Sequence, residues 1–187
     1  MKRLILASGS PRRKDLLDKY GFTYSIIKSD YEEKDVFPTP EETATARAAG
    51  KAENVFNKLV NKENCVVLGA DTIVVLNGEI LGKPKDKSDA INTLTRLSGK
   101  EHVVITAYCI ITSDKIISRF VSSYVQFYNL NNKTIENYVN TGLPLDKAGS
   151  YGIQDGYNLV KSIRGSVNNV IGLPIELFES ELKTLLK

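Results

Sequence analysis

The feature that most constrains the fold is a strand–loop–helix corner near the start of the chain. An apolar run at residues 4–7 suits a buried strand and gives way to Ser8, Gly9 and Ser10. A helix is predicted to follow, because Ser10 is a suitable N-cap and Pro11 at the first helical position sacrifices no hydrogen bond. A strand that turns directly into a helix favours a mixed α/β fold.

The same corner indicates an anion site. The unpaired N–H groups at a helix start attract negative charge. Arg12 and Arg13 lie in this first turn, where the helix dipole disfavours cations. Two arginines in that position are explained if the corner holds a polyphosphate. The alternative, that both arginines are simply solvated, stays open on these residues alone, because Arg is mostly exposed in proteins.

Length and composition favour one α/β domain over residues 1–187. With 42% hydrophobic and 25% charged residues, the chain resembles neither a disordered nor a membrane protein. The net charge of +3 comes from scattered basic residues and gives little support to nucleic-acid binding. Cys65 and Cys109 lie in apolar runs and are expected to be buried thiols. Without a secretion signal or a transmembrane run, a cytoplasmic protein without membrane contact is expected.

Local signals predict alternating strands and helices. Thr39 begins a capping box with Pro40 at the first helical position, and Asn77-Gly78 is a strong hairpin signal. Residues 30–38 form an acidic, irregular segment, and 143–155 a glycine-rich loop. Helices are expected at 11–20, 40–61, 88–98, 132–140 and 174–187, and strands at 22–29, 65–70, 73–76, 79–81, 102–112, 115–128, 159–163 and 167–171.

Asp71 is the most informative single residue. The apolar strand at 65–70 is predicted to deliver Asp71 and Thr72 at its carboxyl end, where α/β sheets place their ligands. An Asx turn that merely closes the strand remains an alternative. Several cations are candidates to converge on the same cleft, namely Arg12, Arg13, Lys51, Lys83 and Lys85.

One carboxylate facing several cations suits metal-assisted attack on a phosphoanhydride. A divalent ion would offset phosphate charge, and the carboxylate would orient or deprotonate water. Lysine and arginine would stabilise the charge on the leaving pyrophosphate. Glu33 in the acidic segment is a candidate second metal ligand, with a solvated loop acid as the alternative. The single histidine, His102, begins a strand and is expected to be structural, which leaves no serine triad.

Gln154, in the glycine-rich loop, is a candidate for base recognition. Its amide offers a donor and an acceptor side by side. Uracil and thymine present the matching N3–H donor and O4 acceptor, whereas a guanine edge pairs better with a carboxylate. A glutamine that only caps loop backbone is the alternative.

In order along the chain, these motifs resemble the Maf (septum formation inhibitor-like) family of nucleoside triphosphate pyrophosphatases. The resemblance covers nearly the whole chain. It is carried by Leu6-Ala-Ser-Gly-Ser-Pro-Arg-Arg, Lys51-Ala52, Gly69-Ala-Asp-Thr-Ile-Val, Gly82-Lys-Pro, Leu97-Ser-Gly, His102-x-Val-x-Thr-Ala, Pro144-Leu-Asp-Lys-Ala-Gly-Ser-Tyr-Gly-Ile-Gln and Gly172-Leu-Pro.

The resemblance implies a fold and an activity. The fold would be elongated, with a mixed sheet, flanking helices and two lobes around a central cleft, similar to the inosine triphosphate pyrophosphatases. Many members are homodimers. The activity would be Mg²⁺- or Mn²⁺-dependent hydrolysis of a nucleoside triphosphate between the α- and β-phosphates, giving a monophosphate and pyrophosphate.

The resemblance also implies roles for single residues. Asp71 would be the proton acceptor, and Arg12, Thr72 and Gln154 would set substrate selectivity. From the residues themselves, the candidates are Lys51 and Lys83 as catalytic cations, Glu33 and Asp71 as metal ligands, and Ser8, Ser10 and Arg13 as substrate-binding residues. Arg12, Thr72 and Gln154 together resemble the branch that acts on dTTP and UTP, rather than the one preferring 7-methyl-GTP.

One departure bears on base selectivity. The family usually continues Gly-Ile-Gln with Gly-x-Gly, whereas this chain has Asp155-Gly156-Tyr157 and is about one residue shorter. A 7-methyl-GTP-type pyrophosphatase is therefore kept as an alternative. A non-catalytic regulator of cell division or nucleic-acid-binding protein is another, and it would bind DNA or RNA with a steep salt dependence.

Overall fold

A computed structural model describes residues 2–33 and 36–187, so residues 34 and 35 of the acidic segment lie outside the described ranges. The chain forms two compact units. The first contains the residues up to Asp71 together with 106–121 and 172–187, and the second contains 72–105 and 122–171. Strands β3 (Cys65–Leu76), β5 (Glu101–Ile111) and β6 (Ile116–Phe127) each contribute residues to both units.

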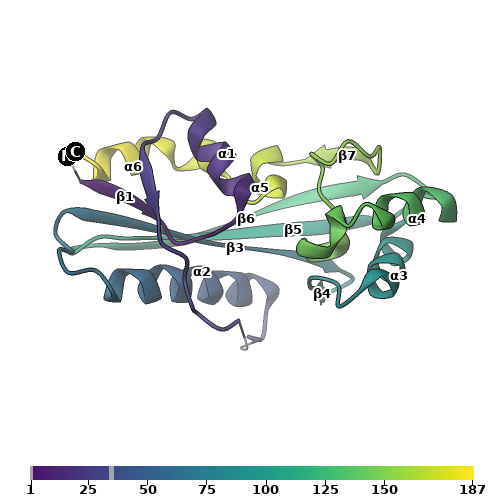
Figure 1. Cartoon of the computed structure of the whole chain (residues 1–187), viewed down its shortest axis with the longest axis horizontal. Helices are drawn as coiled ribbons and strands as arrows, with labels where there is room; N and C mark the ends of the chain where they lie inside the picture. The colour runs from purple at the N-terminus through teal and green to yellow at the C-terminus, as the bar shows by residue number, and fades with distance from the viewer. Residues whose placement is uncertain (1, 34–35) are drawn as a thin grey trace. The chain divides into compact units, whose positions relative to one another are not determined.

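The strands form one mixed sheet in the order β2-β1-β3-β5-β6-β7, with β4 paired to β3 (Figure 1). Strand β1 (Arg3–Leu6) runs parallel to β2 (Tyr24–Ile26) and to β3, whereas the β3–β4 and β6–β7 pairs are antiparallel. A sheet of both pairing types with helices around it is the predicted α/β class, which is confirmed.

In the first unit, helices cover both faces of the sheet. Helix α2 (Pro40–Asn57) lies on one face, and α1 (Pro11–Lys19) and α6 (Glu179–Leu185) lie on the other (Figure 1). Strand β3 is buried almost throughout, as expected for a central strand. The core of this unit includes Leu6, Leu17, Ala48, Val55, Val66, Leu68, Tyr108 and Phe178.

The second unit has a separate core. Helices α3 (Lys87–Leu97) and α4 (Asn132–Asn140) pack against each other, and strands β4 (Glu79–Leu81) and β7 (Val160–Arg164) complete their part of the sheet. The glycine-rich loop contains two short 3-10 helices, Leu143–Asp146 and Ala148–Ser150. The core side chains include Leu76, Leu94, Leu97, Val125, Phe127, Ile135, Tyr138 and Tyr151.

Two local signals are confirmed at atomic detail. The Thr39 side chain accepts a hydrogen bond from Glu42 N at 3.2 Å, and Thr39 N donates to Glu42 Oε2 at 3.1 Å, which is the predicted capping box. Asn77 and Gly78 both have positive φ angles, 52° and 84°, as the two-residue hairpin turn requires.

The prediction of a strand at 167–171 is wrong, because these residues form helix α5 (Val167–Ile171). Ser166 Oγ accepts a hydrogen bond from Asn169 N at 2.9 Å and so caps the helix start. The buried Asn169 side chain then donates to Val104 O at 2.9 Å and to Ser123 Oγ at 2.8 Å. These long-range hydrogen bonds favour a helical turn, rather than a strand, at these residues.

The predicted end of the strand at residue 70 is also wrong. Strand β3 continues to Leu76, so Asp71 lies inside the strand and not at its tip. The residues after Asp71 are Thr72, Ile73 and Val74, all β-branched, and β4 pairs with β3 from Val74 onward.

Other boundaries shift by a few residues. Strand β2 is shorter than predicted, α2 ends at Asn57, and the C-terminal helix is divided into a 3-10 turn at Ile175–Leu177 and α6. Both cysteines are buried and free, as expected. Among the described residues, no helix is long and apolar enough to cross a membrane.

Candidate active site

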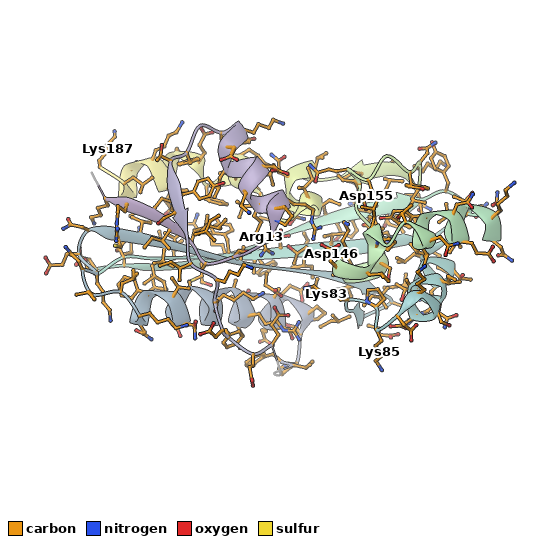
Figure 2. All side chains as sticks on the ribbon, viewed as in Figure 1. Arg13, Lys83, Lys85, Asp146, Asp155 and Lys187 are labelled. Carbon is orange, nitrogen blue, oxygen red and sulfur yellow. The ribbon has the colours of Figure 1, made fainter. Side chains whose placement is uncertain are left out.

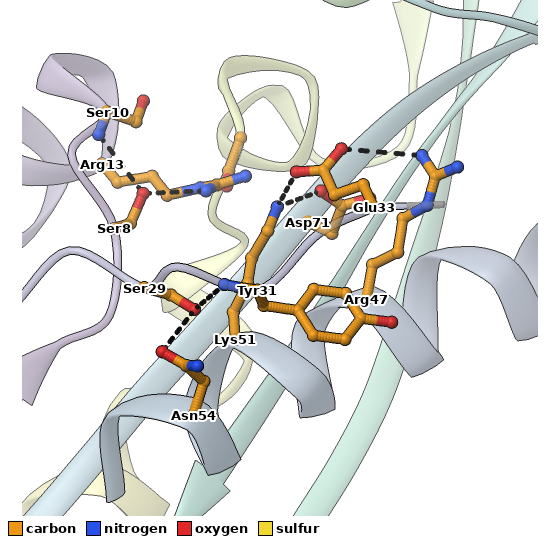
Figure 3. A network of polar contacts seen from close by, with 11 residues as sticks. Ser8, Ser10, Arg13, Ser29, Tyr31, Glu33, Arg47, Lys51, Asn54 and Asp71 are labelled. Atoms are coloured by element: carbon orange, nitrogen blue, oxygen red, sulfur yellow. Dashed lines mark hydrogen bonds and ion pairs between the residues drawn. The ribbon is translucent and has the colours of Figure 1, made fainter. Parts of the chain in front are cut away.

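The loop after β1 folds around the Ser8 hydroxyl. Ser8 Oγ accepts a hydrogen bond from Ser10 N at 3.2 Å and another from Arg13 Nη1 at 3.0 Å (Figure 3). Ser10 occupies the N-cap position of α1, but its side chain makes no capping hydrogen bond. The predicted strand–loop–helix corner is therefore present, and the two hydrogen bonds to Ser8 Oγ hold the loop against the start of the helix.

Arg13 is buried, in contrast to the solvated arginine of the alternative hypothesis. Its Nε donates to Gly172 O at 2.9 Å, which ties α1 to the C-terminal segment. Burial lowers the pKa of the Arg13 guanidinium, and the negative charge of Asp71 opposes that shift. Arginine stays protonated even so. Arg13 thus brings a fixed positive charge into the field of Asp71.

Glycine at position 69 lets α2 approach β3 closely. A Cβ atom at Gly69 would lie 2.5 Å from Ala48 O and 2.7 Å from Ala52 N, both on α2. Alanine on the facing side of the helix completes this close packing. Lys51, which precedes Ala52, is thereby placed beside Asp71, two residues after the glycine.

Lys51 bridges two carboxylates. Its Nζ lies 2.6 Å from Asp71 Oδ1 and 2.6 Å from Glu33 Oε1. Arg47, one turn earlier on α2, lies with Nη1 3.7 Å from Glu33 Oε2 (Figure 3). Arg47 and Lys51 therefore share one face of α2, toward Glu33. The ammonium offsets the charge of a carboxylate pair that would otherwise repel.

A segment before Glu33 is fixed to α2 by side chains. Asn54 Oδ1 accepts hydrogen bonds from Ser29 Oγ at 3.2 Å and Asp30 N at 3.1 Å. The Tyr31 ring lies against α2 (Figure 3), and a Cβ at Gly50 would lie only 2.4 Å from the ring. These contacts hold the segment that presents Glu33 to Lys51.

Asp71 has one oxygen available for chemistry. Its side chain is 7% exposed, and Oδ1 is occupied by Lys51. Oδ2 is buried and has no hydrogen-bond partner among residues 2–33 and 36–187. A buried carboxylate oxygen without a partner is uncommon in folded proteins and indicates a position where a ligand, ion or reacting water completes the site.

The remaining predicted site residues are placed by their own elements. Arg12 is half-buried in the first turn of α1, and Thr72 is half-buried next to Asp71 on β3. Lys83 and Lys85 follow β4 in the second unit and are exposed (Figure 2). Gln154, in the same unit, is exposed on the glycine-rich loop.

The glycine-rich loop is joined to the segment that carries Lys83. Gly149 N donates to Gly82 O at 3.1 Å, and Gly149 itself has a φ of 67°. A Cβ at Gly149 would lie 2.8 Å from the Val74 side chain, so only glycine allows this approach. The loop of Gln154 and the chain just before Lys83 are thus held together within the second unit.

His102 is structural, as predicted. Its ring is buried in the second unit, with Nε2 2.7 Å from the Tyr151 hydroxyl and edge-on contacts to the rings of Phe127 and Tyr151. Burial lowers the pKa of His102 to about 4. The imidazole is therefore neutral at physiological pH.

Sequence reasoning missed the residues that support the site. The packing of α2 depends on Gly69, and the segment before Glu33 depends on Tyr31, Gly50 and Asn54. The small residues around Lys51, Ala48-Ala-Gly-Lys-Ala52, are the sequence signal of such a close approach. The partner of that surface could not be read from the helix itself.

The chain is similar to a known protein family and to several known proteins. A family model described as "Maf-like protein" matches residues 3–185. A dTTP/UTP pyrophosphatase of Clostridium botulinum (strain Okra / Type B1) is 45% identical over 97% of this chain and 96% of its own length. One from Aquifex aeolicus (strain VF5) is 42% identical over 92% of this chain and 90% of its length. The solved structure of a HAM1 protein from Coxiella burnetii has a similar fold, with a TM-score of 0.53 at 14% identity over 98% of this chain and all of that one.

Proposed function

The chain belongs to the Maf family, and we propose on that premise that it hydrolyses dTTP and UTP between the α- and β-phosphates. The products would be the nucleoside monophosphate and pyrophosphate. Relatives named dTTP/UTP pyrophosphatase, at 42–45% identity over nearly the whole chain, support this substrate choice. We further propose that residues 1–187 act as one functional domain, because the family model matches residues 3–185 and so spans both compact units.

The observation that carries the proposal is the unpartnered Oδ2 of Asp71. This oxygen is a buried acceptor, so Asp71 can take the proton of an attacking water. Lys51 holds the other oxygen at 2.6 Å and fixes the orientation of the carboxylate. Lys51 and Arg13 both bring positive charge close to the Asp71 carboxylate.

The chain's own cations would bind the phosphates. Arg13 brings a guanidinium that is held by Ser8 and by the Gly172 carbonyl. A guanidinium fixed in this way loses little entropy when it binds a phosphate oxygen. Arg12 and Lys83, both at least partly accessible, are proposed to contact the rest of the triphosphate.

A divalent cation fits the carboxylates of this site. Glu33 and Asp71 converge on one ammonium, and Asp71 has an orphaned oxygen. Among the described residues there is no cluster of three or more His, Cys, Asp or Glu side chains suited to a metal. Mg²⁺ is commonly bound by only one or two carboxylates together with substrate phosphates, so two are sufficient. When bound, Mg²⁺ or Mn²⁺ would offset the phosphate charge.

Gln154 is proposed to recognise the base. Its exposed side chain is free to present both a donor and an acceptor to the N3–H and O4 groups of uracil or thymine. A carboxylate would suit guanine better, and Gln154 lacks one.

A nucleotide panel tests the proposal. The enzyme is incubated with dTTP, UTP, CTP, GTP and 7-methyl-GTP in Mg²⁺ or Mn²⁺, and the products are separated by ion-exchange chromatography. We expect monophosphate and pyrophosphate from dTTP and UTP, and no turnover with EDTA. Preference for 7-methyl-GTP, or diphosphate with inorganic phosphate as products, would contradict the proposal.

A further inference from the structure

A tight turn carries Gln154 in the second unit. Asp155 N donates to Gly152 O at 3.2 Å, which closes a four-residue turn with Gln154 at its third position. The side chain of Gln154 is exposed, whereas the residues at both ends of the turn are partly buried. The position of the glutamine therefore depends on how the two ends are held.

One phenol oxygen holds both ends. The Tyr138 hydroxyl donates to Asp155 Oδ2 at 2.5 Å and accepts a hydrogen bond from Gly152 N at 2.9 Å. Burial, followed by the hydrogen bond to Asp155, raises the pKa of Tyr138, so the phenol stays protonated and its donor role is fixed. The Tyr138 ring belongs to the core of the second unit. The Tyr138 oxygen thus attaches both ends of the turn to a rigid part of the fold.

Lys147 is the third residue of the network. Its Nζ lies 3.3 Å from Asp155 Oδ2, 3.0 Å from Asp146 Oδ1 and 2.5 Å from Leu143 O. An ammonium has three N–H donors, and these three acceptors match them. The Lys147 side chain is only 8% exposed, so it offers little charge to solvent. Its contacts serve to fix the Asp155 carboxylate.

We propose that Tyr138 and Asp155 are positioning residues for base recognition, which act by holding the turn that presents Gln154. The inference rests on the proposed function and deepens it, because it says how the pyrimidine-reading glutamine is kept in place. A glutamine side chain loses conformational freedom when it binds, and a fixed backbone reduces the further cost of ordering the loop. Loosening the turn should therefore weaken substrate binding more than it slows the chemical step.

A double-mutant cycle tests whether Tyr138 acts through Gln154. The four proteins are wild type, Tyr138→Phe, Gln154→Ala and the double variant, with kcat and KM measured for UTP. We expect Tyr138→Phe to lower kcat/KM by roughly tenfold, mainly through KM, because a hydrogen bond to a charged group is lost. In the Gln154→Ala background the same substitution should change kcat/KM by less than about twofold.

Two further variants separate positioning from a general structural effect. Asp155→Asn keeps an acceptor for the Tyr138 hydroxyl, so it should raise KM less than Asp155→Ala does. Tyr128→Phe removes a phenol oxygen from a tyrosine that is 41% exposed and serves as the matched control. Equal losses from Tyr138→Phe with and without Gln154 would overturn the inference, as would an unchanged KM.

Amide hydrogen exchange tests the turn without substrate. In wild type the Gly152 amide should be protected, and in Tyr138→Phe its exchange should be at least about tenfold faster, with the core helices unaffected. If exchange does not change while wild type hydrolyses UTP, the proposed role of Tyr138 fails and the proposed function stands. If wild type hydrolyses neither dTTP nor UTP, the function and the base-recognition role fail together, and exchange still shows whether Tyr138 holds the turn.

Discussion

Asp71 in the first unit and Asp155 in the second are buried almost equally, with side chains 7% and 11% exposed. Their surroundings differ in hydrogen bonding. Asp155 Oδ2 receives both the Tyr138 hydroxyl and the Lys147 ammonium. Asp71 shares Oδ1 with Lys51, and its Oδ2 has no hydrogen-bond partner within the described part of the chain.

This difference separates two uses of a buried carboxylate. Leaving a buried acceptor unpaired costs about 1–3 kcal/mol, so it persists where a ligand or reactant completes it. A carboxylate oxygen that is already bound by a phenol and an ammonium fixes the backbone around it. Asp71 therefore suits chemistry, and Asp155 suits the positioning of a loop.

Replacing each of these two carboxylates by asparagine should produce the largest effects. Asp71→Asn should lower kcat by about 10²- to 10⁴-fold, because the proposed proton acceptor is lost. Asp155→Asn should leave kcat within about threefold and raise KM, with some loss of stability from the weakened contact with Lys147. Pyrophosphate release at varied UTP concentration measures both. Glu63→Gln, at an exposed loop carboxylate, is the control and should match wild type. Similar kcat losses at positions 71 and 155 would contradict the assignment of chemistry to Asp71 and of loop positioning to Asp155.

Replacing Lys51, the cation between Asp71 and Glu33, should destabilise the fold. Lys51→Met leaves Asp71 and Glu33 without their shared ammonium, and we expect the free energy of unfolding to fall by about 3 kcal/mol. Urea denaturation at pH 7 measures this.

The matched control for Lys51 is Lys58→Met. Lys58 pairs with Asp30, but both side chains are exposed, so its loss should cost less than about 1 kcal/mol. Equal destabilisation by the two substitutions would show that burial of the Lys51 cluster contributes nothing.

The second unit should respond to acid through His102. Its pKa is about 4 in the folded protein and near 6.5 when unfolded, so the unfolded chain binds the proton more readily. The resulting stability is present above pH 6.5 and is lost as the pH falls toward 4. Between pH 7 and pH 5 this loss amounts to about 2 kcal/mol.

Substituting His102 isolates that contribution. His102→Gln is neutral at every pH and can still bond to the Tyr151 hydroxyl. Urea unfolding at the two pH values should show a smaller loss of stability in the variant than in wild type. An identical loss in both proteins would assign the acid sensitivity to other groups.

The smallest expected effect concerns the segment that carries Glu33. Gly50→Ala would place a methyl group 2.4 Å from the Tyr31 ring, which must then move. We expect activation by Mg²⁺ to need about two- to fivefold more metal, the equivalent of roughly 0.5–1 kcal/mol. Titration of activity with Mg²⁺ measures this. Asn57→Ala, at an exposed position of the same helix, is a control for replacement by alanine away from Tyr31. An unchanged Mg²⁺ titration in Gly50→Ala would show that the contact between Tyr31 and Gly50 does not affect activation by the metal.

Local chemistry was predictable from sequence where a short motif determines it. The Thr39 capping box and the Asn77-Gly78 turn depend on neighbours within four residues, and both form as predicted. The strand predicted at 167–171 failed because the helix there depends on Asn169 contacts to Val104 and Ser123, which are distant in sequence.

The candidate site was predictable in its residue types but not in its geometry. Asp71, Lys51 and Glu33 could be named from sequence, whereas their common contact depends on Gly69 admitting α2 to the sheet. The position of Asp71 inside β3 was missed because an apolar run followed by Asp also looks like a strand end. The Tyr138–Asp155 contact joins residues 17 apart across a loop and has no local signal.

Phosphorus NMR of UTP hydrolysis tests whether the unpartnered Oδ2 of Asp71 serves phosphoanhydride cleavage. Wild type and Glu63→Gln should both convert UTP to UMP and pyrophosphate in the presence of Mg²⁺, while folded Asp71→Asn should convert at most about one hundredth as much over the same period. Formation of UDP and inorganic phosphate, or turnover by Asp71→Asn at the wild-type rate, would contradict it.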